Sequence, residues 1–321
     1  MARIWIGLAV AAGLLAGGVT ISFWRDLAAA NARLTGQSET FQTQFGTMEY
    51  ASRGTGPTLL MIHGTGGGFD QALLFAQAIR AKGHRIIAPS RFGYLRSTYP
   101  DEPSAENQAD ALAVLLDHLG IGKIVVAGGS AGAIPAAVFA IRHPDRCAGV
   151  VLLVPASNLS GKDPVEMTSW QKAMVQRLAA SDFAYWSALK IVPRQLTKTL
   201  LATDPELLDR AEASEKRRAE DILSAILPIS HRTRGMLNDG RMAGAPVTFD
   251  YASLAVPTLI ISVEDDRFGT AATARAIAQR VKGSQLVIYP SGGHIWLGHD
   301  EDVAEHISAF IARHPGDAAA D

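Results

Sequence analysis

Short, continuous apolar runs alternate with helical patterns along most of this 321-residue chain. Two of the runs, residues 123–129 (KIVVAGG) and 147–155 (CAGVVLLVP), are apolar at nearly every position. Strands with this composition are buried on both faces, as in a largely parallel sheet with helices on both sides. The sequence therefore predicts an α/β fold with a mostly parallel, doubly wound sheet. The expected strands are residues 58–64, 84–90, 123–129, 147–155, 257–265 and 284–290.

Helical patterns fill the intervals between these strands. One helix is expected to begin after Ser104, which can cap it, with Asn107 three positions later. An antiparallel hairpin is expected before the first parallel strand, around Phe41 to Arg53. The expected helices are residues 69–82, 104–119, 131–143, 270–281 and 302–313.

The interval 156–246 interrupts this alternation, because it contains no buried-strand run and its composition is helical. Ninety residues are too many for a loop, so we expect an inserted helical layer whose aromatic residues pack it onto the body. The body then consists of two parts, residues 41–155 and 247–315. Residues 316–321 (GDAAAD) are expected to be a frayed tail.

The N-terminal segment carries no ionisable residue between Arg3 and Arg25. As a helix it would cover roughly 30 Å, enough to span a bilayer. We expect residues 1–25 to be a signal-anchor and residues 26–40 a polar tether; the alternative is a secretory signal cleaved near residues 28–30, which would leave a secreted or periplasmic protein. The positive-inside tendency predicts a cytoplasmic N-terminus and an extracytoplasmic body.

Charge and cysteine content exclude several kinds of site. The chain has 30 Lys and Arg against 31 Asp and Glu, and this balance argues against a nucleic-acid partner. Its single cysteine, Cys147, excludes an intramolecular disulfide and a multi-cysteine metal site. Because Cys147 begins an apolar strand run, we expect an inert core thiol and not a nucleophile.

A serine lies between glycines where the strand 123–129 meets an apolar helical pattern. Gly128, Ser130 and Gly132 form a G-x-S-x-G pattern in a strand–turn–helix context. Only small flanking residues let strand and helix pass closely enough for the serine hydroxyl to project from the sheet. The context therefore makes Ser130 a candidate nucleophile.

A glycine-rich turn, residues 63–68 (HGTGGG), follows the first parallel strand directly. Such a turn frees backbone N–H groups to face a cavity, as an oxyanion site requires. The competing interpretation, a phosphate cradle for a nucleotide, lacks G-x-G-x-x-G, a Walker motif and an acidic residue at the end of the next strand.

Acidic and histidine candidates follow the last two strands. Glu264, Asp265 and Asp266 end the strand 257–265; Asp266 is best placed to orient a histidine, Asp265 is second and Glu264 third. No motif nearby completes a metal shell. His294 lies on a glycine-flanked loop after the strand 284–290, where a general base would sit, and His299 is its main competitor.

These turns all follow the carboxyl ends of strands, so they should converge on one crevice. Their chain order, serine, acid, histidine, resembles the α/β-hydrolase superfamily over about residues 45–315. Residues 90–97 (SRFGYLRS) are similar to the family's D-x-x-G-x-G-x-S loop, with Ser90 in place of Asp. The interval 156–246 resembles the helical cap of monomeric hydrolases.

The resemblance implies a role for each matched residue. Ser130 would be the nucleophile, His294 the base and Asp266 the orienting acid. The N–H groups of Thr65 and Ala131 would bind the oxyanion, and neither a metal nor an organic cofactor would be needed. A serine at this position implies acyl transfer, and it argues against dehalogenases and epoxide hydrolases, which carry Asp there.

The expected activity is hydrolysis of a small-molecule carboxylic ester with a small or apolar acyl group. A carbon–carbon bond hydrolase and a prolyl-aminopeptidase-like amidase of the same fold are alternatives. An alternative of another class is a non-catalytic, membrane-anchored receptor or scaffold. The basic segment 227–234 (LPISHRTR) is expected to be a solvated helix end, although it could also receive an anionic substrate.

Overall fold

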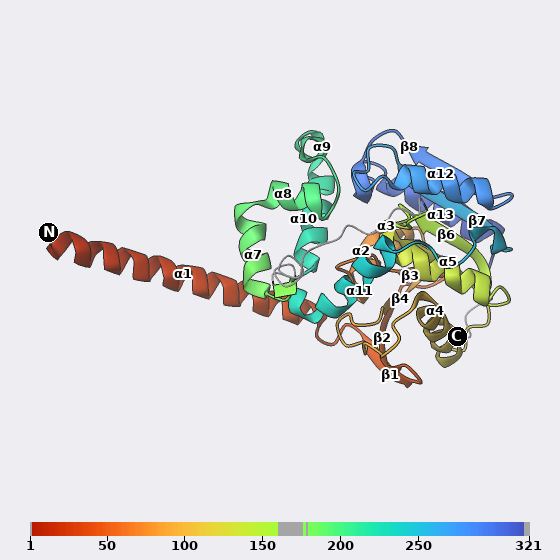
Figure 1. The fold of residues 1–321 in the computed structure, drawn as a ribbon, viewed down its shortest axis with the longest axis horizontal. Coiled ribbons are helices and arrows are strands. Elements are labelled where there is room, and N and C mark those ends of the chain that lie inside the picture. Colours follow the sequence, from red (N-terminus) through yellow and green to blue (C-terminus); the bar gives the residue numbers. More distant parts are fainter. Residues whose placement is uncertain (1, 160–175, 178, 318–321) are drawn as a thin grey trace.

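An eight-stranded sheet forms the centre of the molecule in the computed structural model, which describes residues 2–159, 176–177 and 179–317 (Figure 1). The strand order is β1-β2-β4-β3-β5-β6-β7-β8, and every pair from β4 to β8 is parallel. The first two strands form the expected antiparallel hairpin. The strands are β1 (Glu39–Thr43), β2 (Gly46–Arg53), β3 (Thr58–Ile62), β4 (Arg85–Ser90), β5 (Ile124–Gly129), β6 (Cys147–Leu153), β7 (Thr258–Val263) and β8 (Gln285–Tyr289).

The central strands are buried along their whole length, which confirms the prediction, made from their continuous apolar runs, that they are covered on both faces. Cys147, at the start of β6, is only 1% exposed. Burial raises the pKa of its thiol to about 12, so it is an inert core thiol as expected.

Helices cover both faces of the sheet and form two separate cores. Leu112, Phe139 and Ile277 belong to the core on one face, and Ile79 and Phe310 to the core on the other. The helix after Ser104 is capped as expected, since the Ser104 hydroxyl accepts a hydrogen bond from the Asn107 N–H at 3.1 Å. The covering helices are α4 (Ala105–His118), α5 (Ala133–Arg142) and α12 (Thr270–Arg280) on the first face, and α2 (Phe69–Phe75), α3 (Gln77–Ala81) and α13 (Asp300–Arg313) on the second.

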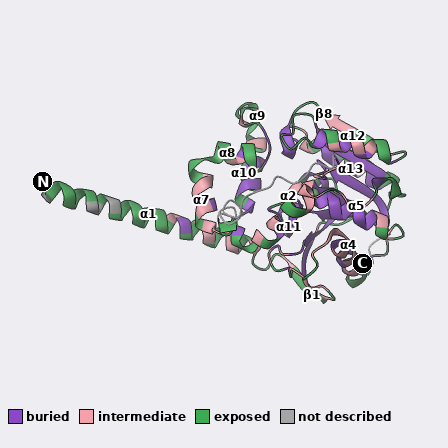
Figure 2. Cartoon of the chain, in the orientation of Figure 1, coloured by how far each residue is buried: buried purple, intermediate pink, exposed green. Residues whose placement is uncertain are grey.

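The insertion between β6 and β7 is helical and packs at the carboxyl ends of the strands. Figure 2 shows that its buried positions face inward while much of its outer surface is exposed. Residues 160–175 and 178 of the predicted cap lie outside the described residues. The described cap helices are α7 (Asp182–Ile191), α8 (Pro193–Thr199), α9 (Pro205–Arg210), α10 (Ala213–Ala225) and α11 (Thr233–Gly244).

The N-terminal helix α1 (Ala2–Leu34) extends further than the sequence suggested. Residues 26–34 of the expected polar tether are helical, because this end of α1 packs against the cap. Phe23 is buried against Trp186, and the Trp186 indole N–H donates to Asp26 at 3.0 Å. The other half of α1 projects from the body, and among the described residues α1 is long and apolar enough to be a membrane anchor or a signal sequence (Figures 1 and 2).

The C-terminal tail also differs in part from the expectation. The N–H of Asp317 donates to the Lys123 carbonyl at 2.8 Å, so residues 316 and 317 lie against the start of β5. Residues 318–321 of the predicted frayed tail lie outside the described residues.

Candidate active site

Ser130 occupies a tight turn between β5 and α5. Its φ of 53° lies in the left-handed region, where a non-glycine residue is strained. A Cβ on Gly128 would lie 2.3 Å from the Gly132 carbonyl oxygen, and one on Gly132 would lie 2.4 Å from the His63 carbonyl oxygen. The two glycines therefore let β5, α5 and the strand beside them approach closely enough to force this turn.

The glycine-rich turn after β3 lies directly against Ser130. A Cβ on Gly64 would be 3.1 Å from the Cβ of Ser130. The next residue, Thr65, lines the same cavity as Ser130. In the described part of the chain, the backbone N–H of Thr65 donates no hydrogen bond. Ala131 lies at the start of the helical turn after Ser130, where N–H groups have no acceptor within the helix. Two N–H groups are therefore placed beside the serine.

The three acidic candidates have different partners. Asp266 Oδ2 lies 2.7 Å from Nδ1 of His294. Asp265 instead accepts a hydrogen bond from the N–H of Gly293 at 2.8 Å, so it holds the histidine loop and not the histidine ring. Glu264 forms an exposed ion pair with Arg275. The structure thus brings the first-choice acid to the histidine.

The Asp266 carboxylate is buried and accepts several hydrogen bonds. Besides His294, it accepts hydrogen bonds from the Thr270 hydroxyl and from the Phe268 N–H. Burial alone would raise its pKa, but His294 and the two other donors outweigh burial, and the pKa of Asp266 is lowered. The carboxylate is therefore ionised at neutral pH and can hold the Nδ1–H of His294.

Ser130 and His294 line one cavity of about 800 Å³, together with Thr65 and Ala131. No hydrogen bond joins the Ser130 hydroxyl to His294 among the described residues, and such contacts often form only when substrate binds. The wall is largely apolar, and both the cap and the body contribute to it. Its apolar side chains include Phe75, Leu200, Leu201, Ile222, Ile226, Met236, Phe268 and Ile295.

Two other histidines, His299 and His231, do not line this cavity. His299 stacks on Tyr289, and its Nε2 lies 2.9 Å from the Ser291 carbonyl oxygen. His231 lines a different, smaller pocket beside the loop 93–99. The geometry therefore favours His294 as the histidine of the site.

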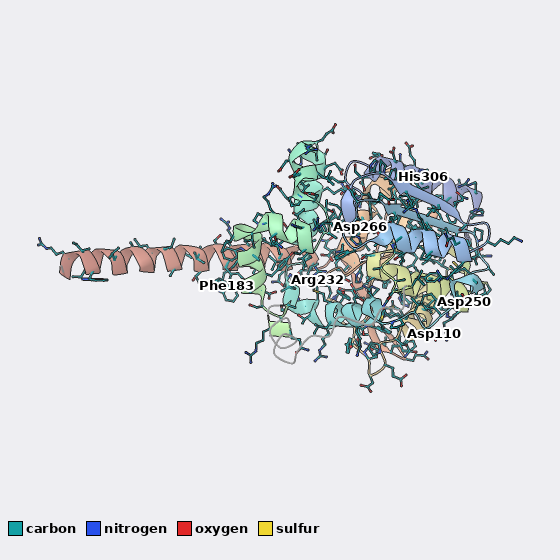
Figure 3. The ribbon with its side chains drawn as sticks, turned by 45° about the horizontal axis from the view of Figure 1, so that its top comes forward. Asp110, Phe183, Arg232, Asp250, Asp266 and His306 are labelled. Carbon is teal, nitrogen blue, oxygen red and sulfur yellow. The ribbon has the colours of Figure 1, made fainter. Side chains whose placement is uncertain are left out.

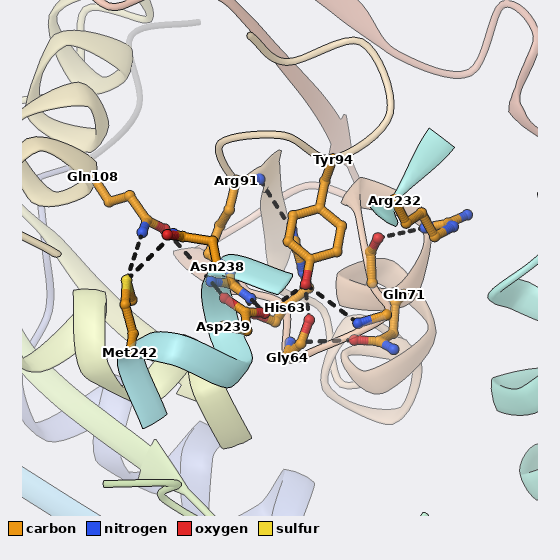
Figure 4. A network of polar contacts seen from close by, with 12 residues as sticks. His63, Gly64, Gln71, Arg91, Tyr94, Gln108, Arg232, Asn238, Asp239 and Met242 are labelled. Carbon is orange, nitrogen blue, oxygen red and sulfur yellow. Dashed lines mark hydrogen bonds and ion pairs between the residues drawn. The ribbon is translucent and has the colours of Figure 1, made fainter. Parts of the chain in front are cut away.

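A buried polar network, which sequence reasoning missed, contacts the glycine-rich turn (Figure 4). Arg91, after β4, forms two short hydrogen bonds with Asp239 of α11, and both side chains are almost fully buried. The Tyr94 hydroxyl donates to the same carboxylate and accepts from the N–H of Gly66. Burial would lower the pKa of Arg91, but Asp239 raises it, so the guanidinium stays charged.

His63 fixes the orientation of the peptide that carries the Thr65 N–H. The backbone N–H of Arg91 donates to Nε2 of His63, so the ring proton of His63 is on Nδ1. This Nδ1–H donates to the Gly64 carbonyl at 2.7 Å. In a trans peptide the C=O and N–H point in opposite directions, so the Thr65 N–H points away from His63. Burial, reinforced by the Arg91 charge, lowers the pKa of His63 well below 6.5, and the ring stays neutral.

The basic segment 227–234 was expected to be a solvated helix end, but its Arg232 is fully buried. The guanidinium forms two hydrogen bonds with Asp70, at 3.0 and 2.8 Å, and a third with the Gly67 carbonyl. Figure 3 shows Arg232 where the cap meets the body, near the end of α1. A sequence run of basic residues does not reveal an arginine whose acid lies 162 positions away.

Comparisons with known proteins agree with this architecture. A family model described as "alpha/beta hydrolase fold" matches residues 57–298, more than half of the chain. "Uncharacterized hydrolase YcgS" of Bacillus subtilis (strain 168) is 26% identical over 280 residues, which cover 82% of this chain and 93% of that protein. A 2-hydroxy-6-oxo-6-phenylhexa-2,4-dienoate hydrolase of Burkholderia cepacia is 26% identical over 267 residues, which cover 80% of this chain and 86% of that protein.

A solved structure resembles the chain over almost its full length. The crystal structure of a membrane phospholipase A, described as a bacterial virulence factor, matches with a TM-score of 0.63 at 20% identity. The match covers 98% of this chain and 99% of that chain, so it includes α1. At this identity the likeness concerns the fold alone.

Proposed function

Because the chain belongs to the α/β-hydrolase family, we propose that it is a serine hydrolase that cleaves a carboxylic ester through an acyl-enzyme on Ser130. One observation carries this proposal. Ser130, at a strained turn, shares a cavity with His294, whose Nδ1 is held by the buried Asp266. This is the arrangement that an activated serine nucleophile requires.

The proposed reaction has two halves. His294 Nε2 takes the hydroxyl proton of Ser130 as the serine oxygen attacks the ester carbonyl, and the N–H groups of Thr65 and Ala131 stabilise the oxyanion. Collapse of this intermediate breaks the ester C–O bond, and His294 returns the proton to the leaving alcohol. Water then attacks the acyl-enzyme, again with His294 as base, and releases the acid.

The cavity supports an apolar acyl group as the substrate class. Its wall contains aliphatic side chains from the cap, such as Leu201, Ile222 and Ile226. An apolar pocket with few polar groups binds through buried area and selects chain length more than functional groups. The activity of the phospholipase A with a similar fold, which its name assigns to lipids, is compatible with this class.

We further propose that α1 stays attached as a membrane anchor. Phe23 and Asp26 contact Trp186, and the Arg33 guanidinium donates to the carbonyls of Ala225 and Leu227. Cleavage near residues 28–30 would remove the first two of these contacts and expose Trp186.

A fluorophosphonate probe tests the nucleophile. We expect labelling of the wild type and none of Ser130→Ala, with Ser157→Ala as a matched control because Ser157 also lines the cavity. Equal labelling of the wild type and Ser130→Ala would contradict the assignment. No labelling of the wild type would favour the non-catalytic receptor or scaffold.

The bond cleaved is tested with a substrate series. We expect turnover of p-nitrophenyl esters to rise with acyl chain length. Carbon–carbon bond hydrolysis is the second candidate, since the Burkholderia cepacia relative is named for such a substrate. Faster turnover of a vinylogous 1,5-diketone than of any ester would establish that alternative, and faster turnover of a prolyl amide would establish the amidase.

A further inference from the structure

Two tryptophans delimit the apolar part of α1. Trp5 and Trp24 are 70% and 61% exposed, and the residues from 4 to 24 include no ionisable side chain. A helix of this length covers roughly 30 Å, the thickness of the hydrocarbon core. Tryptophans concentrate at the two membrane–water interfaces. If α1 is the proposed anchor, Trp24 marks the interface on the side of the body.

The cap helix α7 is attached to α1 at this level. The ring of Phe23, next to Trp24, lies 5.2 Å from the ring of Phe183 and 5.6 Å from that of Trp186. The Lys190 ammonium pairs with Asp26 at 3.0 Å. Figure 1 shows α7 crossing α1 and forming the part of the body nearest its projecting half. Helix α7 therefore runs beside the interface and not away from it.

The exposed side chains of α7 and the start of α8 have the composition of an interfacial segment. Phe183, Ile191 and Val192 are 48%, 76% and 44% exposed. Residues 182–199 carry Lys190, Arg194 and Lys198 against one acid, Asp182; Lys190 pairs with Asp26 and Arg194 with Asp209. Exposed apolar side chains among basic ones are typical of segments that lie in the headgroup region, where basic groups meet anionic lipid.

We propose that the α7–α8 corner, defined as Ile191 and Val192, lies at the headgroup–acyl boundary of the bilayer that α1 spans, together with Phe183 at the opposite end of α7. This second membrane contact rests on the proposed anchoring and fixes how the body faces the membrane. Helix α8 leads from the corner to Leu200, which is 38% exposed and lines the cavity. A seven-residue helix is about 10 Å long, so the cavity wall begins about that far from the bilayer.

Selective labelling tests the contact without requiring catalysis. Cys147 is buried and its thiol pKa is raised, so a cysteine introduced by Val192→Cys is the reactive one. The full chain is labelled with an environment-sensitive fluorophore and placed in phosphatidylcholine–phosphatidylglycerol vesicles that contain shallow nitroxide lipids. The matched control is Leu286→Cys, because Leu286 is a similarly exposed apolar residue on β8.

We expect the label at position 192 to be quenched several-fold more than the label at position 286. Equal quenching at both positions would overturn the proposal. Extraction with alkaline carbonate tests the anchor separately from the corner. Protein released by carbonate would contradict the anchor and the corner together, whereas retained protein with an unquenched label at position 192 would contradict the corner alone.

A second experiment measures the consequence for substrate access. The double variant Ile191→Asp/Val192→Asp changes only exposed side chains. We expect about tenfold slower turnover of a long-chain ester embedded in vesicles and unchanged turnover of a soluble short-chain ester. Leu286→Asp should affect neither reaction. Equal losses on both substrates, or on neither, would contradict a membrane contact at the corner.

Discussion

The carboxylate of Asp239, on the cap helix α11, faces the guanidinium of Arg91, on the loop after β4, through two contacts of 2.6 and 2.5 Å. This pair joins the cap to the body directly behind the glycine-rich turn. The Tyr94 hydroxyl donates to Asp239, and His63 accepts a hydrogen bond from the backbone N–H of Arg91. We therefore expect a shift of the cap to change the shape of the turn.

Asp239→Asn should therefore be strongly destabilising. It leaves the buried guanidinium of Arg91 without a counter-charge, and breaking such a pair costs about 3–5 kcal/mol. The free energy of unfolding, measured with urea in detergent micelles, checks this. Asp209→Asn is the matched control, since its pair with Arg194 is exposed and should contribute little. A loss no larger than that of the control would contradict the coupling.

Asp266→Asn should reduce kcat on a p-nitrophenyl ester by about 10⁴-fold with little change in KM, because an amide favours the wrong tautomer of His294. Asp265→Asn should have a smaller effect, since Asp265 holds only the Gly293 N–H. Glu264→Gln should resemble the wild type. Full activity of Asp266→Asn together with an inactive Asp265→Asn would assign the role of the orienting acid to Asp265.

Stability should decrease as the pH falls below about 6.5. Burial lowers the pKa of His63 well below its ordinary 6.5, so in this range the unfolded chain binds a proton that the folded protein does not. Above about pH 6.5 His63 no longer changes the free energy of unfolding with pH. Below it, His63 lowers this free energy by at most about 1.4 kcal/mol per pH unit. Urea unfolding between pH 5 and 8 measures it.

The slope should decrease in His63→Gln and to a smaller extent in His84→Gln, because burial also lowers the pKa of His84. His306 is exposed, so His306→Gln serves as the control and should keep the wild-type slope. An unchanged slope in His63→Gln would assign the pH dependence to other groups.

Gly128→Ala should prevent correct folding or abolish activity, since its methyl group would lie 2.3 Å from the Gly132 carbonyl oxygen. Gly240→Ala is the contrasting change. Gly240 lies within α11 with open space around its Cβ position, and alanine there should stabilise the protein by about 0.5–1 kcal/mol. Thermal unfolding of both variants tests the pair of expectations, and similar unfolding temperatures would contradict them.

The sheet and the positions of Ser130, Asp266 and His294 could be predicted from the sequence because each depends on local signals. Strands buried on both faces leave unbroken apolar runs, and the turns that follow them are marked by glycine or by acidic residues. The parallel arrangement then brings the ends of these strands to one edge, and no further information is needed to place the candidates together.

The contacts of the cap could not be predicted in this way. Arg91 and Asp239 are 148 positions apart, and each resembles a surface residue in its own segment. The same holds for Arg232 and Asp70, and for the packing of Phe23 against the cap. In each case the partner comes from a distant segment, so neither hydrophobic periodicity nor charge pattern indicates burial.

The attachment of α1 to the cap also sets an order of events during synthesis. Arg33 donates to the carbonyl of Ala225, which follows it by 192 residues. At about 5–20 residues per second, a ribosome needs roughly 10–40 s to make that stretch. If α1 is the proposed anchor, it enters the membrane before its partners in the cap have been made, and the cap then folds against a helix that is already inserted.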